Sequence, residues 1–403
     1  MGEAQIFGLI SGLVLLAFGA NRLFRITRVP DLVVLLVTGL VLGPVLKWIN
    51  PDQFRTFTQL LGSLALILIL LEGGMELNLR EGIRHFPGGV ILAFLGYGIC
   101  FWAVAATAHY TLWIPWRSAL LLGAVFGCTS STVVMPVLQQ LKAREPVRVT
   151  LLLESALGDV IGVLCVSTLM NSSATGGQLA GFMSGFAMNA GIALTIGIAA
   201  GVGWWWLWPR VADQRFSNAL AFSIVLGVYS ATHAAHGSGL LAVLAFGLVL
   251  GNLPQREGQP AQEIQFVTFH SDLSFLVRSF FFVLLGSIVE FVGRRYILPI
   301  FGIVAAMLLA RFAAVQISRV ALRGTTREEK ELIFLVMPRG LITAVLAVQV
   351  VQGKGAEFSF LPAMAFTAIL ATNILLVIAS VRVKNQENAA AEIVSSAPLN
   401  AAD

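Results

Sequence analysis

Charged residues are scarce in this chain of 403 residues. Asp, Glu, Lys and Arg together make up only 12% of it, whereas an ordinary soluble domain carries about 25%. Hydrophobic residues account for 57% of the chain, and its mean hydropathy is +0.85. These values exclude a soluble globular protein and predict an integral membrane protein that crosses the lipid bilayer many times.

Several kinds of chemical motif are also missing. The three cysteines lie inside apolar stretches without CxxC or Cys/His spacing, which argues against a disulfide framework or a zinc site. The sequence has no GxxxxGK[ST] phosphate-binding loop and no cofactor fingerprint, so we expect no cofactor and no ATP-driven pumping by this chain. The net charge of +5 is spread singly over short loops, so we expect no nucleic-acid partner.

Long apolar runs separated by short polar segments predict an all-α polytopic membrane protein. The runs are unbroken for about 20 residues, which suits a transmembrane helix, whereas strands of a barrel would alternate in polarity over about ten. The first run has no basic segment before it and is interpreted as a retained helix. We predict thirteen spans, at approximately 5–21, 30–49, 57–76, 88–110, 117–140, 147–171, 180–208, 217–234, 238–252, 273–291, 297–318, 329–352 and 360–381.

The distribution of basic residues predicts how these spans are oriented. Most of the 26 Lys and Arg residues fall in loops on the side of the C-terminus. Because cytoplasmic loops carry the excess of Lys and Arg, we expect a cytoplasmic C-terminus, in a bacterial inner membrane. Residues 1–384 then form one transmembrane unit, and residues 385–403, rich in Ala, Asn and Ser, are expected to be a short disordered cytoplasmic tail.

Ionisable residues inside a span mark a candidate site, because lipid does not tolerate them unless they are paired or hydrated. The deepest are Glu72, Glu154, Asp159, Arg311 and Arg339. In the sixth span, Ser155 and Asp159 share a helix face, while Glu154 lies about 140° away. One acid can therefore form a buried ion pair while the other exchanges ions. The alternative is that both acids pair with Arg311 and Arg339 and only lock the helices together.

Two spans contain sequences that interrupt a helix. The fifth has Cys128-Thr129-Ser130-Ser131-Thr132, whose hydroxyls compete for backbone hydrogen bonds, and the twelfth has Met337-Pro338-Arg339-Gly340. These spans are seven apart, as expected if spans 1–6 recur as spans 8–13 in an inverted repeat. Discontinuous helices at corresponding positions of two repeats indicate the central site of a transporter.

Six stretches of the sequence form a characteristic series. They are Leu71-Glu72-Gly73-Gly74-Met75-Glu76-Leu77, Thr129-Ser130-Ser131-Thr132, Glu154-Ser155-Ala156-Leu157-Gly158-Asp159, Ser238-Gly239-Leu240-Leu241-Ala242-Val243 with Gly247-Leu248-Val249-Leu250-Gly251-Asn252, Phe280-Phe281-Phe282-Val283-Leu284-Leu285-Gly286, and Pro338-Arg339-Gly340. In this order they resemble the monovalent cation/proton antiporter superfamily, over essentially the whole membrane part. The resemblance implies two crossed discontinuous helices, a moving core domain around spans 3–6 and 10–13, and a dimerisation domain from the remainder, hence a homodimer.

The resemblance also implies roles for the buried polar residues. Asp159 would bind the transported monovalent cation or a proton alternately, with Ser155, Thr129 and Ser130 as oxygen ligands. Glu154 would pair with Arg311, and Arg339 would compensate the dipole ends of the broken helices. Two residues depart from the family: Gly158 stands where one branch has Asn and another a second Asp, and Ser130 stands where many exchangers have Asp.

The function predicted from the sequence is therefore secondary antiport of Na⁺ or K⁺ against H⁺. Because Gly158 supplies no second titratable group, we expect electroneutral exchange of one cation for one proton, with Glu72 as the only nearby candidate for a second proton carrier. A cation channel or uniporter on the same fold is the alternative. A membrane-embedded enzyme using Asp159 is disfavoured because Glu154 points elsewhere on the helix.

Overall fold

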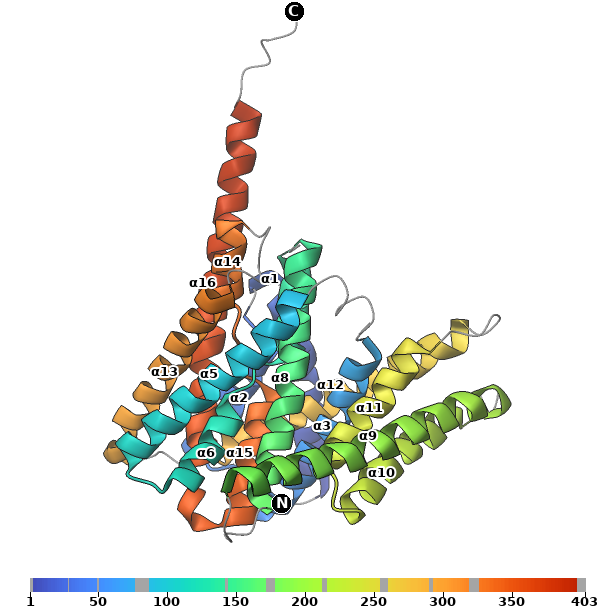
Figure 1. The fold of residues 1–403 in the computed structure, drawn as a ribbon. Coiled ribbons are helices and arrows are strands. Elements are labelled where there is room, and N and C mark those ends of the chain that lie inside the picture. The colour runs from blue at the N-terminus through green and yellow to red at the C-terminus, as the bar shows by residue number, and fades with distance from the viewer. Residues whose placement is uncertain are drawn as a thin grey trace, which may run out of the picture.

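A computed structural model describes residues 3–27, 29–48, 51–76, 87–141, 144–171, 178–211, 216–253, 260–289, 293–318 and 326–396 (Figure 1). Within these ranges the chain is helical and forms no strand, which confirms the predicted all-α class. The helices are α1 (Glu3–Thr27), α2 (Asp31–Leu40), the π-helical η1 (Val41–Val45), α3 (Pro51–Glu76), α5 (Pro87–Leu112), α6 (Trp116–Phe126), α7 (Ser131–Gln140), α8 (Glu145–Asn171), α9 (Gln178–Val211), α10 (Ser217–Ala234), α11 (Gly239–Asn252), α12 (Pro260–Ser287), the 3₁₀-helical η2 (Arg294–Tyr296), α13 (Ile297–Ile317), α14 (Arg327–Leu335), α15 (Leu341–Lys354), the 3₁₀-helical η4 (Ala356–Phe358) and α16 (Leu361–Ser396).

The lengths and compositions of these helices fit a membrane protein. Among the described residues, 8 candidate spans are long and apolar enough to cross a bilayer, and shorter apolar helices accompany them. One of them, Trp116–Leu138, joins α6 to α7 and corresponds to the fifth span predicted from the sequence. The exact number of thirteen spans stays a prediction.

The two predicted interruptions are present. In the fifth predicted span, α6 ends at Phe126 and α7 begins at Ser131. In the twelfth, α14 ends at Leu335 and α15 begins at Leu341, on either side of Pro338. Because proline has no N–H and clashes with the preceding turn, α14 cannot run on through this residue.

Close helix pairs follow the pattern that the predicted inverted repeat requires. Helix α2 packs on α12, and α3 packs on α11. These contacts join predicted span 2 to span 10 and predicted span 3 to span 9. A repeat of spans 1–6 as spans 8–13 relates span 2 to span 9 and span 3 to span 10, so it converts each of these two contacts into the other. Glycines allow both contacts: a Cβ on Gly39 would lie 2.0 Å from the Val283 carbonyl oxygen, and one on Gly247 would lie 2.5 Å from the Leu71 carbonyl oxygen. Small residues of this kind let transmembrane helices approach closely.

Helices α3 and α12 pack mainly on each other and on α11 and α2. The main partners of α3 are α11 and α12, and those of α12 are α2 and α3, whereas α5 packs chiefly on α6, α8 and α13. The glycine contacts on α2 and α11 therefore place spans 3 and 10 with spans 2 and 9 rather than with spans 4–6. The division into a moving and a dimerisation domain stays a prediction.

The C-terminal helix is longer than the sequence predicts. Helix α16 runs without interruption from Leu361 to Ser396 and extends beyond the other helices (Figure 1). Residues 385–396, expected to be a disordered tail, are therefore helical in the structure. The run Asn388-Ala389-Ala390-Ala391-Glu392 explains the difference, because Ala and Glu have high helix propensity. Residues 397–403 lie outside the described part of the chain.

Candidate functional site

Four charged side chains are buried where the two broken helices meet α8 and α13. Asp159 and Glu154 lie on α8, Arg311 lies on α13, and Arg339 lies in the break between α14 and α15. Each is no more than 5% exposed, and no other Asp, Glu, Lys or Arg among the described residues is buried. All four are residues that the sequence singled out.

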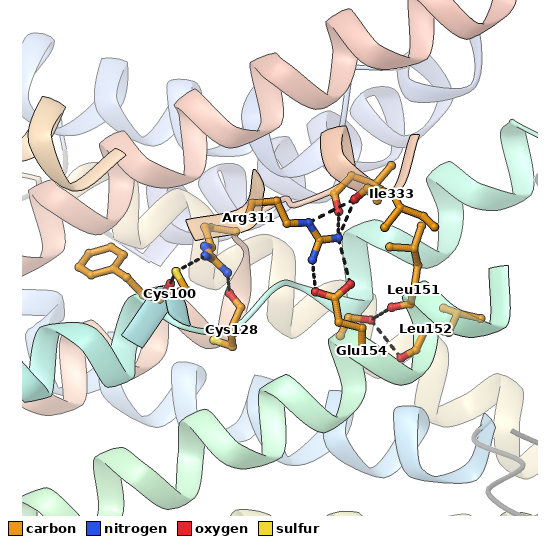
Figure 2. A network of polar contacts seen from close by, with 11 residues as sticks. Cys100, Cys128, Leu151, Leu152, Glu154, Arg311 and Ile333 are labelled. Atoms are coloured by element: carbon orange, nitrogen blue, oxygen red, sulfur yellow. Dashed lines mark hydrogen bonds and ion pairs between the residues drawn. The ribbon is translucent and has the colours of Figure 1, made fainter. Parts of the chain in front are cut away.

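Glu154 and Arg311 form the ion pair that the sequence predicts (Figure 2). Arg311 donates from Nη1 to Glu154 Oε1 and from Nη2 to Glu154 Oε2, the latter at 3.0 Å. The same guanidinium donates from Nη2 to the carbonyl oxygens of Ile333 (2.7 Å) and Val336 (3.1 Å) at the end of α14. Arg311 thus satisfies carbonyls that the broken helix leaves unpaired, while Glu154 neutralises its charge.

Asp159 is buried without an arginine partner. Its Oδ2 accepts a hydrogen bond from Ser131 Oγ at 2.8 Å, and its buried Oδ1 has no hydrogen-bond partner in the described part of the chain. Ser131 is the first residue of α7, so the carboxylate lies at a helix N-terminus, which favours negative charge. Asp159 forms no ion pair with Arg311 or Arg339, and its Oδ1 remains available to a proton or a cation.

The three predicted oxygen ligands, Ser155, Thr129 and Ser130, lie in different surroundings. Within the described ranges none of them forms a hydrogen bond to Asp159, whereas Ser131 does. Ser155 is buried one helical turn before Asp159 and donates its hydroxyl to the carbonyl oxygens of Leu151 (2.9 Å) and Leu152 (3.1 Å). Its lone pairs can still accept a hydrogen bond or bind a cation. Thr129 is buried in the α6–α7 break. The Ser130 hydroxyl pairs instead with Thr132 Oγ1 at 2.9 Å.

Ser131 is the residue of this string that contacts Asp159, and it was not among the predicted ligands. The available signal was its position in the same hydroxyl string, next to Ser130. Which of several consecutive hydroxyls faces α8 depends on where α7 begins, and the sequence did not fix that residue.

The two breaks cross in direct contact. The backbone N–H of Ser130 donates to the Pro338 carbonyl oxygen at 2.8 Å. A Cβ on Gly340 would lie 2.1 Å from Ser130 Oγ and 2.7 Å from Ser130 Cβ. Only glycine therefore fits at position 340 without a shift of one of the two crossing segments.

Two polar residues of α16, Thr372 and Asn373, form hydrogen bonds with the backbone of the second break and were not predicted as part of the site. The backbone N–H of Arg339 donates to Thr372 Oγ1 at 3.0 Å, and the Arg339 carbonyl oxygen accepts from Asn373 Nδ2 at 2.8 Å. Both α16 side chains are fully buried. Their signal was a Thr-Asn pair in the middle of an otherwise apolar span.

Glu72 lies apart from these charges. It is half-buried on α3, a helix whose main partners are α11 and α12. Its side chain forms no hydrogen bond or ion pair with Asp159 or Arg339, so the structure does not bring it into the polar cluster.

An all-helical membrane fold with buried charges at two crossed broken helices is the architecture of a secondary transporter. Residues 12–384 match the family described as "Sodium/hydrogen exchanger, transmembrane". The chain belongs to this sodium/hydrogen exchanger family.

Individual relatives include antiporters of two cations. The chain is 27% identical over 330 residues to the K(+)/H(+) antiporter NhaP2 of Shewanella baltica, which covers 79% of this chain and 56% of that protein. It is 27% identical over 351 residues to Na(+)/H(+) antiporter 1 of Methanocaldococcus jannaschii, covering 80% of this chain and 78% of that protein. The chain thus spans about half the length of the NhaP2 relatives that it matches.

A solved structure shows the same fold. The sodium proton antiporter MjNhaP1 of Methanocaldococcus jannaschii at pH 8 superposes with a TM-score of 0.72 and 22% sequence identity, over 94% of this chain and 96% of that one.

Proposed function

We propose that this protein exchanges Na⁺ or K⁺ for H⁺ at Asp159. The observation that supports this proposal most directly is the state of that carboxylate: it is 2% exposed, bonded through one oxygen to Ser131, and without a partner at the other. A buried acid held in this way is costly to leave ionised and unpaired, so it favours the uptake of a proton or a cation.

The proton and the cation compete for the same carboxylate in this mechanism. When a cation binds, the hydroxyl oxygens of Ser131, Ser155 and Thr129 replace part of its hydration shell. Exchange is one for one, because Glu154 is already neutralised by Arg311 and Gly158 has no titratable side chain. Both cations remain candidates, since the relatives' names include Na⁺ and K⁺.

Alternating access completes the proposal. Rocking of a core domain that contains the crossed helices would expose Asp159 to either side of the membrane in turn, against a dimerisation domain that pairs two copies of the chain. The asymmetry of basic residues supports a cytoplasmic C-terminus, and the bacterial inner membrane is the proposed location.

The test is exchange by Asp159→Asn in reconstituted vesicles. Collapse of an imposed pH gradient is followed by fluorescence dequenching with Na⁺, K⁺ or Li⁺, while an ionophore clamps the membrane voltage. We expect wild type to exchange and Asp159→Asn to be folded but inactive. Asp272→Asn, at an exposed acid on α12, serves as the control and should retain exchange.

Two results would contradict the proposal. Cation-dependent dequenching that persists in Asp159→Asn would show that this carboxylate does not carry the ions. Cation current that continues without any proton gradient would instead indicate a channel or uniporter.

A further inference from the structure

The two buried arginines have similar surroundings but different charge partners. Arg311 donates to both oxygens of the Glu154 carboxylate. Within the described part of the chain, the Arg339 guanidinium donates only to neutral groups: from Nη1 to the Cys128 carbonyl oxygen and from Nη2 to Cys100 Sγ at 3.1 Å. Its Nε is buried and has no hydrogen-bond partner among the described residues. Arg339 therefore carries a positive charge that its direct contacts do not neutralise.

This charge and the Asp159 carboxylate act on the same short segment. Arg339 binds the carbonyl of Cys128, and three residues later Ser131 donates to Asp159. Residues 128–131 thus join the guanidinium to the carboxylate without an ion pair between them. An unpaired positive charge in a buried site stabilises a nearby ionised acid, because few water molecules screen the interaction.

Cys100 determines how that guanidinium is held. Its thiol, on α5, accepts from Arg339 Nη2 and donates to the carbonyl oxygen of Phe126, the last residue of α6, at 3.4 Å. The thiol is 4% exposed. A neutral thiol is a weak acceptor, so it can orient the arginine without removing its charge, as a carboxylate would.

We propose that Cys100 is a positioning residue for exchange: its neutral thiol keeps Arg339 beside the α6–α7 break and leaves the guanidinium charge to act on Asp159. This inference rests on the proposed antiport at Asp159. It assigns to Cys100 an effect on the pH range of transport, in addition to its packing.

Other charged and titratable side chains face the region around Arg339 and Asp159, and a test has to leave these side chains unchanged. Glu154 and Asp159 come from α8, and Arg311 comes from α13. Tyr97 from α5, Cys128 from the break and Cys165 from α8 complete the set. Substitutions at position 100 change none of these side chains, so the change in the pH profile reports the acceptor that Arg339 meets.

The experiment compares three substitutions of Cys100 in reconstituted vesicles, with exchange measured across pH. Cys100→Asp pairs the guanidinium and places a negative charge near Asp159, so the proton is released only at higher pH. We expect the pH of half-maximal exchange to rise by about one unit or more. Cys100→Val removes the acceptor and slightly enlarges the side chain. The guanidinium is then free to pair with Asp159, which lowers that pH and raises the KM for the cation. Cys100→Ser keeps a neutral acceptor and should restore the wild-type profile.

Opposite shifts from Asp and Val at one position are the result that packing alone would not produce. Ala108→Val, at a buried apolar residue of the same helix α5, is the control for added volume and should leave the profile unmoved. If Cys100→Asp does not fold, Cys100→Val and Cys100→Ser still decide the question. The inference is wrong if the folded Val variant loses rate but keeps the wild-type pH profile and KM.

The same series separates this inference from the proposed function. Wild type and Asp159→Asn are measured alongside the Cys100 variants. Failure of the proposed function would appear as no exchange in wild type, or as exchange that survives Asp159→Asn. Failure of the present inference would leave those two results as expected and affect only the Cys100 variants.

Discussion

Replacing Arg311 with Met tests the buried ion pair that joins α8, α13 and α14. The substitution leaves the Glu154 carboxylate, 5% exposed, without its counter-charge. It also removes the donors of the Ile333 and Val336 carbonyls at the end of α14. Breaking a buried pair costs about 3–5 kcal/mol, and the two carbonyls place the expected loss toward the upper end of that range.

A double variant separates the charge from the carbonyls. In the double variant, Arg311→Met with Glu154→Leu, neither charge of the ion pair remains. Only the carbonyls of Ile333 and Val336, which have lost their donors, then lower the free energy of unfolding. We expect a loss of roughly 1–3 kcal/mol, smaller than that of Arg311→Met alone. The control is Arg278→Met, which breaks a pair with Asp31 at 3.3 Å whose side chains are 23% and 17% exposed. That loss should be about 1 kcal/mol or less.

The assay is unfolding of the purified protein in detergent, followed by intrinsic tryptophan fluorescence. We expect the order of stability to be wild type, then Arg278→Met, then the double variant, and finally Arg311→Met. The reasoning is refuted if Arg311→Met and Arg278→Met lose the same free energy of unfolding. It is also refuted if the double variant loses as much as Arg311→Met and Glu154→Leu, each measured singly and then added together.

Two further substitutions probe the crossing and the carrier. Gly340→Ala should destabilise the protein and abolish exchange, because its Cβ would lie 2.1 Å from the Ser130 hydroxyl oxygen in the other break. The control is Gly73→Ala, which has nothing within 4 Å of its Cβ and should have the stability of wild type. Equal stability of the two variants would count against the close crossing. Ser131→Ala should leave folding intact and raise the KM for the cation several-fold, because it removes the 2.8 Å hydrogen bond to Asp159 and one oxygen ligand. Exposed Ser184→Ala is its control in the vesicle assay, and an unchanged KM in Ser131→Ala would exclude that ligand.

The positions of the helices could be predicted because the membrane imposes a simple rule on the sequence. A span needs about 20 apolar residues, and each loop between spans is polar. The breaks could be predicted for a local reason as well, since Pro338 cannot continue a helix and the Ser130 hydroxyl competes for backbone hydrogen bonds. The packing of α3 and α12 could not, because it depends on which glycines meet between helices far apart in the sequence.

Within the site, pairs of opposite charge were easier to predict than hydrogen bonds to the backbone. Arg311 had to find an acid, and Glu154 was available on another buried helix. The contacts of Thr372 and Asn373 join α16 to the backbone of Arg339, 33 and 34 residues away. Any backbone group can accept or donate in this way, so residue type alone did not indicate the partner.

Arg311 is paired with a carboxylate, whereas Arg339 contacts neutral groups, and this difference determines how the proposed exchange would respond to membrane voltage. Arg311 and Glu154 cancel each other whatever the carrier holds. In the proposed mechanism Asp159 would be neutral with either a proton or a monovalent cation, so the site would have the same total charge with each load, namely that of Arg339. A voltage would therefore act equally on the two loaded forms, which is the physical reason why the proposed exchange of one cation for one proton would be electroneutral. A second acid that released its proton on cation binding would break this equality; Gly158 supplies none, and Glu72 lies on α3, away from the cluster.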